Sequence, residues 1–293
     1  MMAKAERALP RSVNLEEIAE HYDALLCDLW GVVHDGHALY PGALDALQFL
    51  RKRGVKPVFI SNAPRRSHMV KQKLRELGVS DDMYLDVLTS GETLRALLQS
   101  GAFAKAPVHY MLVAERRDGD ICDGLPGFDR VHSVEAANLV VIAGYPDAAR
   151  SCDAILPLLE KLLAGNKTVI CANPDKYVVR LEGKREQCAG CIADAYRAMG
   201  GDVLEVGKPF SDIYKYALER YCKSVDKRRV ACIGDNMDTD VRGAVDNGMD
   251  AYLVAGGMHA AEIEEKGTAS FLRSYSLLPT GILPAFCAPR ATS

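Results

Sequence analysis

Short apolar runs alternate with helical patterns along much of the chain, and this alternation constrains the fold more than any other feature. Residues 24–29, 55–60 and 85–88 are apolar runs with the length of buried strands. Residues 41–53 and 66–77, which lie between these runs, carry apolar side chains at helical spacing. Strands and helices that alternate in this way are joined by right-handed crossovers, so the strands become parallel. The sequence therefore predicts an α/β protein built on a parallel sheet.

The same pattern returns near the C-terminus, after an interruption that is long enough to be a domain. Residues 229–233 and 251–254 are further strand-like runs, with helical patterns before and between them. Roughly 85 residues between the two halves have strand and helix patterns of their own, which is enough for a small domain. A length of 293 residues also favours two domains. We therefore expect a discontinuous sheet domain at residues 1–103 and 191–293, with an inserted domain at residues 104–190.

Charge and composition exclude several classes of function. The chain has 36 basic and 39 acidic residues and a net charge of −3, which is unlike a protein that binds nucleic acid or an anionic membrane. Residues 138–143 are typical of the longest apolar runs and fall far short of the roughly 20 residues that cross a bilayer. Residues 1–11 carry charges and a proline, which is unlike a secretory signal. We expect no nucleic-acid partner and no membrane association.

The cysteines favour a reducing compartment. Nine is an odd number, and the irregular spacing is unlike a disulfide framework. Cys188 and Cys191 form a single CxxC pair, which lacks the second pair or the histidines of a zinc site. We expect this pair to be structural and the protein to be cytoplasmic.

Polar residues that can carry out chemistry stand at the predicted ends of strands or at a helix start. They are Asp28, Ser61, Asn62, Lys208, Asp235 and Asp240. Each alone is typical of a turn or a helix cap. Because ligands bind beyond the carboxyl ends of parallel strands, however, the predicted fold brings the whole set to one rim of the sheet.

This combination of side chains suits phosphoryl transfer. An aspartate such as Asp28 can attack phosphorus and form an acyl phosphate, which splits one difficult step into two. A carboxylate and a phosphate ester repel each other, so a cation is needed, and Mg²⁺ prefers carboxylate oxygens such as those of Asp28 and Asp235. Ser61 can hold the phosphoryl oxygens, and Lys208 can offset the charge that develops.

Four short segments, in this order, resemble the motifs of the haloacid dehalogenase (HAD) superfamily. They are Asp28–Val32, Ser61–Asn62, Gly207–Pro209 and Gly234–Asp240. Two further segments, Tyr40–Ala43 and Ala172–Asp175, look like subclass IIA, the branch of sugar phosphate, pyridoxal phosphate and 4-nitrophenyl phosphate phosphatases. The resemblance covers residues 20 to 260 and implies a Rossmann-like core with an inserted α/β cap domain. It also suggests a homodimer.

The resemblance implies a magnesium site. Asp28 would be the nucleophile and a Mg²⁺ ligand, the backbone carbonyl of Trp30 a second ligand and Asp235 a third. Asp240 would support the metal-bound waters or Lys208. The expected activity is Mg²⁺-dependent hydrolysis of a small phosphate monoester.

The resemblance also implies where the substrate binds. Ser61 and Asn62 would bind the phosphoryl group, and Lys208 would stabilise it and orient Asp28. Residues 173–175 would lie in the cap and face the substrate. The expected ligand is a small phosphorylated metabolite.

Trp30 departs from the phosphatase pattern. The phosphatases of this superfamily carry a second aspartate at this position, which protonates the leaving alcohol and later activates water. Indole is a very weakly acidic donor and cannot do this. A general acid typically contributes about 10²–10⁴-fold to the rate, so we expect weak activity on esters with poor leaving groups.

Three explanations of Trp30 are open. A neighbour, His34 or Asp35, can substitute for the missing acid. The reaction can instead be dehalogenation, since the dehalogenases of the superfamily carry an aromatic residue here, although Asp235 and Asp240 resemble a preserved metal site that those enzymes lack. Finally, the protein can be a binding or regulatory module that recognises a phosphorylated ligand and turns it over slowly.

Overall fold

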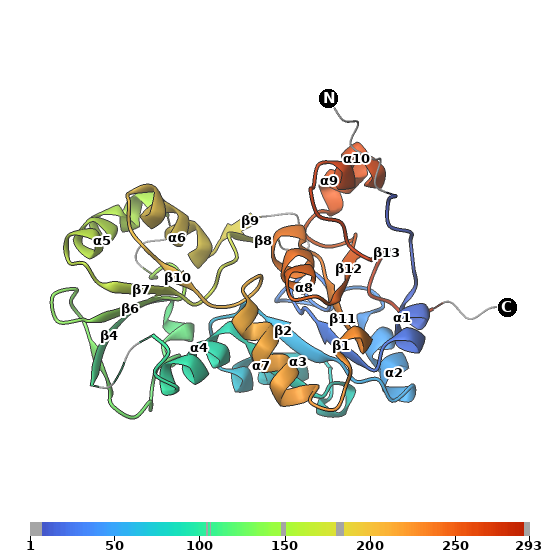
Figure 1. Ribbon diagram of the computed structural model, residues 1–293, viewed down its shortest axis with the longest axis horizontal. Helices are drawn as coiled ribbons and strands as arrows, with labels where there is room; N and C mark the ends of the chain where they lie inside the picture. The colour runs from blue at the N-terminus through green and yellow to red at the C-terminus, as the bar shows by residue number, and fades with distance from the viewer. Residues whose placement is uncertain (1–7, 104, 106, 148–150, 180–184, 290–293) are drawn as a thin grey trace.

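Two parallel sheets form the two ends of the molecule. The computed structural model describes residues 8–103, 105, 107–147, 151–179 and 185–289. In Figure 1, a sheet of six strands lies on the right and a sheet of five strands on the left. A short antiparallel pair, Tyr177–Val179 (β8) and Arg185–Gln187 (β9), lies between them.

The six-stranded sheet is parallel throughout and has the order β13–β12–β11–β1–β2–β3. Its strands are Ala24–Cys27 (β1), Val58–Ser61 (β2), Asp86–Thr89 (β3), Val230–Gly234 (β11), Asp250–Val254 (β12) and Gly281–Leu283 (β13). Cys27 of β1 is in register with Ile233 on one side and with Phe59 on the other. The strand order reverses between β1 and β11, which is the switch point of a Rossmann-like sheet and the usual place for a ligand. The α/β class and the Rossmann-like sheet are confirmed.

Helices cover both faces of the six-stranded sheet. One face carries Leu15–His21 (α1), Ala43–Lys52 (α2) and Ser67–Glu76 (α3). The other face carries Ser211–Tyr221 (α7), Arg242–Asp246 (α8) and Thr268–Arg273 (α10), with Ala260–Lys266 (α9) against α10. Successive strand residues alternate between the faces, so Leu26 and Cys27 belong to different cores. In the described part of the chain, no helix combines the length and the apolar character needed to cross a membrane.

β2 begins later than the sequence pattern predicts. The pattern predicts a strand at residues 55–60, whereas β2 spans Val58–Ser61. Pro57 has no N–H group to donate to the ladder of an interior strand, so the strand starts after it. The strand also ends one residue later than the pattern predicts, so Ser61 is its last residue and stands at the carboxyl edge of the sheet.

The five-stranded sheet is also parallel and has the order β10–β7–β6–β4–β5. Its strands are Val108–Val113 (β4), Phe128–Val131 (β5), Leu139–Ile142 (β6), Thr168–Cys171 (β7) and Leu204–Glu205 (β10). Ser90–Gln99 (α4) packs on one face, and Cys152–Ala164 (α5) and Ala189–Ala198 (α6) pack on the other. Elements that pack with this sheet therefore lie on both sides of residues 104–190. Before this range, α4 covers one face of the sheet, and after it β10 forms one edge.

The C-terminal apolar stretch, residues 277–286, packs on the large sheet. The sequence leaves open whether this stretch contacts the core or a partner. β13 pairs in parallel with β12, and the side chains of Ile282, Leu283 and Phe286 are buried. The stretch therefore completes one edge of the six-stranded sheet.

Replacement of Phe59 by alanine tests the larger core. The Phe59 side chain is fully buried under α1–α3, and its ring centroid lies 5.2 Å from that of Tyr84. Because Phe59→Ala leaves a cavity, we expect the free energy of unfolding to fall by about 3–5 kcal/mol in urea denaturation. The control, Leu85→Ala, changes a side chain that is 55% exposed and should alter stability by no more than about 0.5 kcal/mol. A loss below about 1 kcal/mol for Phe59→Ala would contradict this packing.

Candidate active site

The carboxyl ends of β1 and β11 place two carboxylates side by side. Asp28 directly follows β1 and Asp235 directly follows β11, and the amide of Asp28 donates a hydrogen bond of 2.8 Å to the carbonyl of Ile233. Asp240 joins them from the π-helical turn Met237–Val241 (η4). Oxygens of the three carboxylates lie within 4.8 Å of one another. This cluster stands at the switch point of the sheet, as the sequence predicts for these residues.

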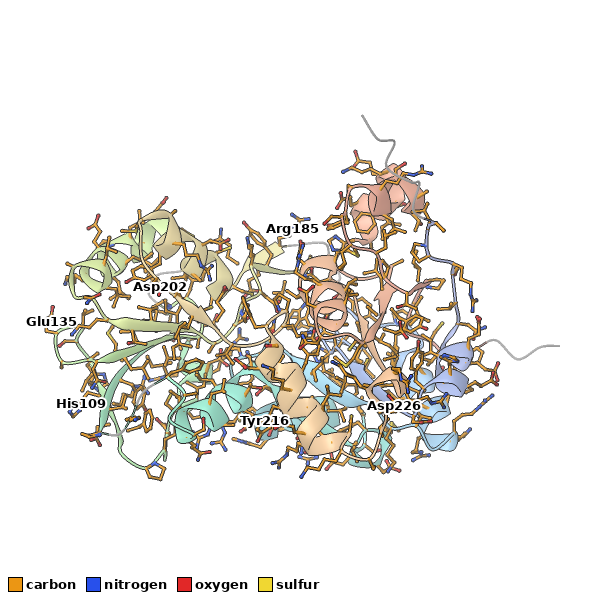
Figure 2. All side chains as sticks on the ribbon, viewed as in Figure 1. His109, Glu135, Arg185, Asp202, Tyr216 and Asp226 are labelled. Carbon is orange, nitrogen blue, oxygen red and sulfur yellow. The ribbon has the colours of Figure 1, made fainter. Side chains whose placement is uncertain are left out.

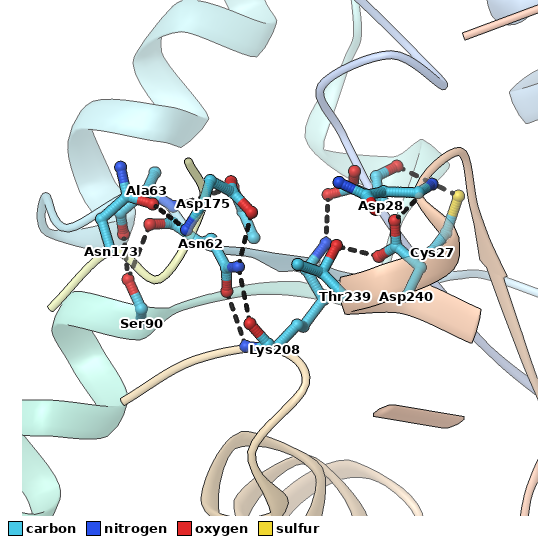
Figure 3. A network of polar contacts seen from close by, with 12 residues as sticks. Cys27, Asp28, Asn62, Ala63, Ser90, Asn173, Asp175, Lys208, Thr239 and Asp240 are labelled. Atoms are coloured by element: carbon cyan, nitrogen blue, oxygen red, sulfur yellow. Dashed lines mark hydrogen bonds and ion pairs between the residues drawn. The ribbon is translucent and has the colours of Figure 1, made fainter. Parts of the chain in front are cut away.

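Lys208 supplies the positive charge of this cluster. Its Nζ donates to Oδ1 of Asp28 and to Oδ1 of Asp240, each over 2.7 Å (Figure 3). The lysine side chain is almost wholly buried. Burial by itself would lower the pKa of Lys208, but the carboxylates of Asp240 and Asp28 outweigh it and raise that pKa above its usual value. The ammonium is therefore charged at every ordinary pH.

Three carboxylates share one lysine, so the cluster holds an excess of negative charge. Burial raises the pKa of Asp28 to about 7, although Lys208 opposes the shift. Burial also raises the pKa of Asp235, and the neighbouring Asp28 and Asp240 raise it further. In both groups, burial and the neighbouring carboxylates disfavour the ionised form, and a bound cation would offset that effect. The donor set fits Mg²⁺, which takes carboxylate oxygens, and it is the one cluster of this kind among the described residues.

The backbone at Gly31 passes close to the carboxylate of Asp235 and restricts its position. Gly31 has a φ of +84°, and a Cβ atom there would lie 1.8 Å from Oδ2 of Asp235. The amide of Met258 donates to the same oxygen over 2.6 Å. Glycine is required at position 31, because any side chain would collide with the carboxylate and would disfavour this backbone conformation.

Asn62 joins the end of β2 to two other segments. Its Oδ1 accepts a hydrogen bond of 2.6 Å from the amide of Lys208, and its Nδ2 donates to the carbonyl of Lys208 over 2.9 Å. Nδ2 also donates to Oδ1 of Asp175 over 2.8 Å (Figure 3). Ser61 is buried beside it, and its Oγ accepts from the amide of Ala63 over 3.2 Å. The side-chain amide of Asn62 therefore positions both Lys208 and Asp175.

Trp30 contacts the small antiparallel pair. Its Nε1 donates a hydrogen bond of 2.9 Å to the carbonyl of Val179 in β8. Its ring meets that of His34 edge to face, with centroids 5.9 Å apart. The indole that stands where a second carboxylate is expected thus links the loop after β1 to the antiparallel pair that lies between the two sheets.

His34 and Asp35 both have roles in the loop that follows Trp30. Oδ1 of Asp35 accepts hydrogen bonds from the amides of His37 and Ala38, over 2.8 and 2.7 Å, which stabilises a turn. Nδ1 of His34 accepts from the amide of Gly36 over 3.0 Å, and burial lowers the pKa of His34 to about 4. Neither residue lines the cavity around Asp28, so these contacts do not favour either one as the missing acid.

Two neighbouring cavities share the lining residues Trp30, Ser61, Asp175 and Val178. We call the cavity around Asp28, of about 30 Å³, the inner cavity, and its neighbour, of about 100 Å³, the outer cavity. The inner cavity is lined by residues that include Asp28, Ser61, Asn62, Asp175, Lys208 and Asp235. The candidate residues identified from sequence thus line one small cavity.

An ion pair between Arg65 and Asp118 borders the outer cavity and is absent from the sequence analysis. Nε of Arg65 lies 3.0 Å from Oδ1 of Asp118, and the Asp118 side chain is buried. Burial raises the pKa of Asp118, and Arg65 opposes that rise. Arg65 stands three residues after Asn62, which is a usable sequence signal, whereas Asp118 belongs to none of the motifs.

Comparison with known proteins assigns the family. A model of haloacid dehalogenase-like hydrolases matches residues 25–118, and a HAD-hydrolase-like model matches residues 205–275. Sugar-phosphatase AraL of Bacillus subtilis is 30% identical over 80% of this chain and 83% of its own length. Chronophin of Mus musculus is 27% identical over 89% of each chain. The chain therefore belongs to the haloacid dehalogenase-like hydrolases, as its four motifs indicate.

Solved structures agree with this assignment. A haloacid dehalogenase-like hydrolase from Brucella suis is 35% identical, with a TM-score of 0.80, over 94% of this chain and 99% of that one. The glycerol phosphate phosphatase of Mycobacterium tuberculosis in complex with magnesium is 23% identical, with a TM-score of 0.70, over 92% of this chain and 76% of that one. At 23% identity, the similarity to the second structure shows a shared fold and no more.

The buried His34 predicts an effect of pH on stability. Its pKa is lowered from 6.5 to about 4, so the unfolded chain binds more protons between these values. His34 therefore stabilises the fold above about pH 6.5, and this contribution is lost as the pH falls through about 4. We expect the stability difference between the wild type and His34→Gln to shrink by up to about 3 kcal/mol between about pH 7 and pH 4.

Urea denaturation at the two pH values measures this difference. The raised pKa values of Asp28 and Asp175 act in the opposite direction, so the comparison with the variant is needed to isolate His34. The exposed His37 provides the control, since His37→Gln should follow the wild type at both pH values. Parallel pH profiles for the wild type and His34→Gln would refute the prediction.

Proposed function

We propose that the protein is a Mg²⁺-dependent phosphatase that hydrolyses a small phosphate monoester through an aspartyl-phosphate on Asp28. The observation that carries the proposal is the buried network of Lys208 with Asp28 and Asp240, beside Asp235, at a small cavity. The relatives named sugar-phosphatase and glycerol phosphate phosphatase support the substrate class.

The proposed reaction assigns a role to each residue of the inner cavity. Lys208 binds one oxygen of the Asp28 carboxylate and fixes its rotation, so that the carboxylate can attack phosphorus in line with the leaving group. The hydroxyl of Ser61 and the nearby backbone amides bind the phosphoryl oxygens. The Lys208 ammonium stabilises the charge that develops there, and Asn62 holds the backbone of Lys208 in place.

Magnesium fits the carboxylate side of the cavity. Asp28, Asp235 and the backbone carbonyl of Trp30 would hold the ion, with Asp240 beside them. When bound, the ion offsets the charge of the carboxylates and of the phosphate ester. The raised pKa of Asp235 is consistent with a carboxylate that needs such a partner.

We further propose that the six-stranded part is the core domain and the five-stranded part is the cap domain. The cap would exclude water from the inner cavity and select the substrate through the residues of the outer cavity. The Trp30–Val179 hydrogen bond and the Arg65–Asp118 ion pair support a closed arrangement of the two. The cytoplasmic location and the homodimer stay predictions.

Removal of the nucleophile tests the proposal. Asp28→Asn cannot form the aspartyl-phosphate, so we expect hydrolysis of a panel of phosphate monoesters to fall by more than about 10³-fold. The control, Asp238→Asn, changes an exposed carboxylate in the same loop region and should keep the wild-type rate. Release of inorganic phosphate in the presence of MgCl₂ is the measurement.

Two results would contradict the phosphatase proposal. Halide release from a 2-haloacid that is unaffected by EDTA would identify a dehalogenase. Tight binding of phosphate esters without turnover in the wild type would identify a binding module.

Metal binding can be tested without activity. Asp235→Asn removes one proposed ligand, so we expect its affinity for Mg²⁺ in isothermal titration calorimetry to fall by more than about tenfold. Without the ion the variant should be no less stable than the wild type, because it removes a charge that its neighbours disfavour. The metal-binding assignment fails if Asp235→Asn and the control Asp238→Asn bind Mg²⁺ equally well.

A further inference from the structure

The loop before β8 brings a carboxyl group to the junction of the two cavities. Asp175 lies between β7 and β8, and it lines both the inner cavity around Asp28 and the outer cavity. If phosphorus occupies the inner cavity and the rest of the ester the outer one, the leaving oxygen lies at this junction. Among the described residues, Asp175 is the one carboxyl that borders both spaces.

The other acidic residues of the outer cavity are less suited to meet that oxygen. Asp118 is paired with Arg65 at 3.0 Å, and Glu115 is paired with Arg117 at 2.6 Å. Glu186 borders only the outer cavity. None of the three lines the space around Asp28.

Hydrogen bonds fix the position of Asp175. Its Oδ1 accepts from Nδ2 of Asn62 over 2.8 Å, and Asn62 is itself held by two bonds to the backbone of Lys208. Its amide donates to Oδ1 of Asn173 over 3.2 Å. Because Oδ1 is occupied as an acceptor, Oδ2 is the oxygen suited to carry a proton.

The electrostatic surroundings allow Asp175 to hold that proton near neutrality. Burial raises its pKa to about 6, while Lys208 and the Asn62 amide oppose the rise and Asp240 adds to it. A carboxyl group with a pKa close to the working pH can both give and take a proton, which is what a general acid–base needs.

We propose that Asp175 is the general acid and base of this enzyme and replaces, from the cap loop, the aspartate that Trp30 displaces. The proposal rests on the phosphatase function proposed above. In the first step the Asp28 carboxylate forms a bond to phosphorus, the ester P–O bond breaks, and the leaving oxygen takes the proton from Asp175. The products are the aspartyl-phosphate, the free alcohol and an ionised Asp175.

The second step restores the starting state. A water oxygen attacks phosphorus and gives one proton to the Asp175 carboxylate. The bond between phosphorus and the Asp28 oxygen breaks, and its electron pair returns to Asp28 as a carboxylate. Inorganic phosphate leaves, and Asp175 is protonated for the next cycle.

The test compares leaving groups in Asp175→Asn. The substituted side chain keeps an oxygen that can accept from Asn62, so the loop contact is retained. We expect the single-turnover cleavage of phenyl phosphate to slow by about 10²–10⁴-fold, because phenolate is a poor leaving group without a proton. Cleavage of 4-nitrophenyl phosphate should slow at least about tenfold less, because nitrophenolate leaves readily without one.

The second step gives an independent signature. Without its base, the variant should release a burst of about one equivalent of nitrophenolate and then turn over slowly as the aspartyl-phosphate accumulates. The matched control is Asp202→Asn, an exposed carboxylate at the left of Figure 2, which should behave as the wild type with both substrates.

Two outcomes overturn the proposal. An equal loss with phenyl and 4-nitrophenyl phosphate, without a burst, assigns Asp175 a structural role only. Unchanged rates with both esters exclude any role for Asp175 in proton transfer. If the wild type hydrolyses both esters and Asp28→Asn does not, either outcome refutes Asp175 alone, whereas a wild type without hydrolysis refutes the phosphatase function as well.

Discussion

One buried ammonium between two carboxylates is the interaction on which the rest of the site depends. Lys208 reaches Asp28 and Asp240 at the same distance, 2.7 Å, inside the protein. Removing one partner from such a network leaves an uncompensated buried charge, which typically costs about 3–5 kcal/mol. The end of β1, the turn after β11 and the segment after β10 must therefore meet in one arrangement. Because β10 is a strand of the five-stranded sheet, assembly of the site also constrains how the two sheets are joined.

Asn62 extends this constraint to the loop between β7 and β8. One side-chain amide satisfies the N–H and the carbonyl of Lys208 and also donates to Asp175 (Figure 3). Buried polar groups need such partners, so an apolar residue at position 62 would leave several of them unpaired at once. The same side chain thus holds the lysine that stabilises charge and the carboxyl group that we assign to proton transfer. Hydrogen bonds to this one side chain therefore set the relative placement of the two groups.

The sequence predicts those parts of the fold whose local pattern is strong. β1, β11 and β12 are apolar runs, and the polar residues that follow them identify the rim of the site. β5 exposes Asp129 and Arg130, and β13 has three residues, so neither shows the pattern of a buried strand. Leu94 and Leu98 of α4 are four residues apart, as on one face of a helix. Which of the two sheets this face covers is decided by tertiary contacts that the spacing does not encode. The bond between Asn62 and Asp175 joins residues 113 positions apart, which no local pattern encodes.

The indole of Trp30 relates the missing acid to the cap. A carboxylate at position 30 cannot donate a hydrogen bond, whereas the indole N–H donates to the carbonyl of Val179 in β8. Trp30 therefore binds the strand that follows the Asp175 loop, and the residue that displaces the acid helps to hold its proposed replacement. An acid at position 30 would belong to the core and be in place whether or not the cap is closed. Under the proposed cap assignment, an acid at position 175 belongs to the cap, so protonation of the leaving group would require the closed state that also excludes water.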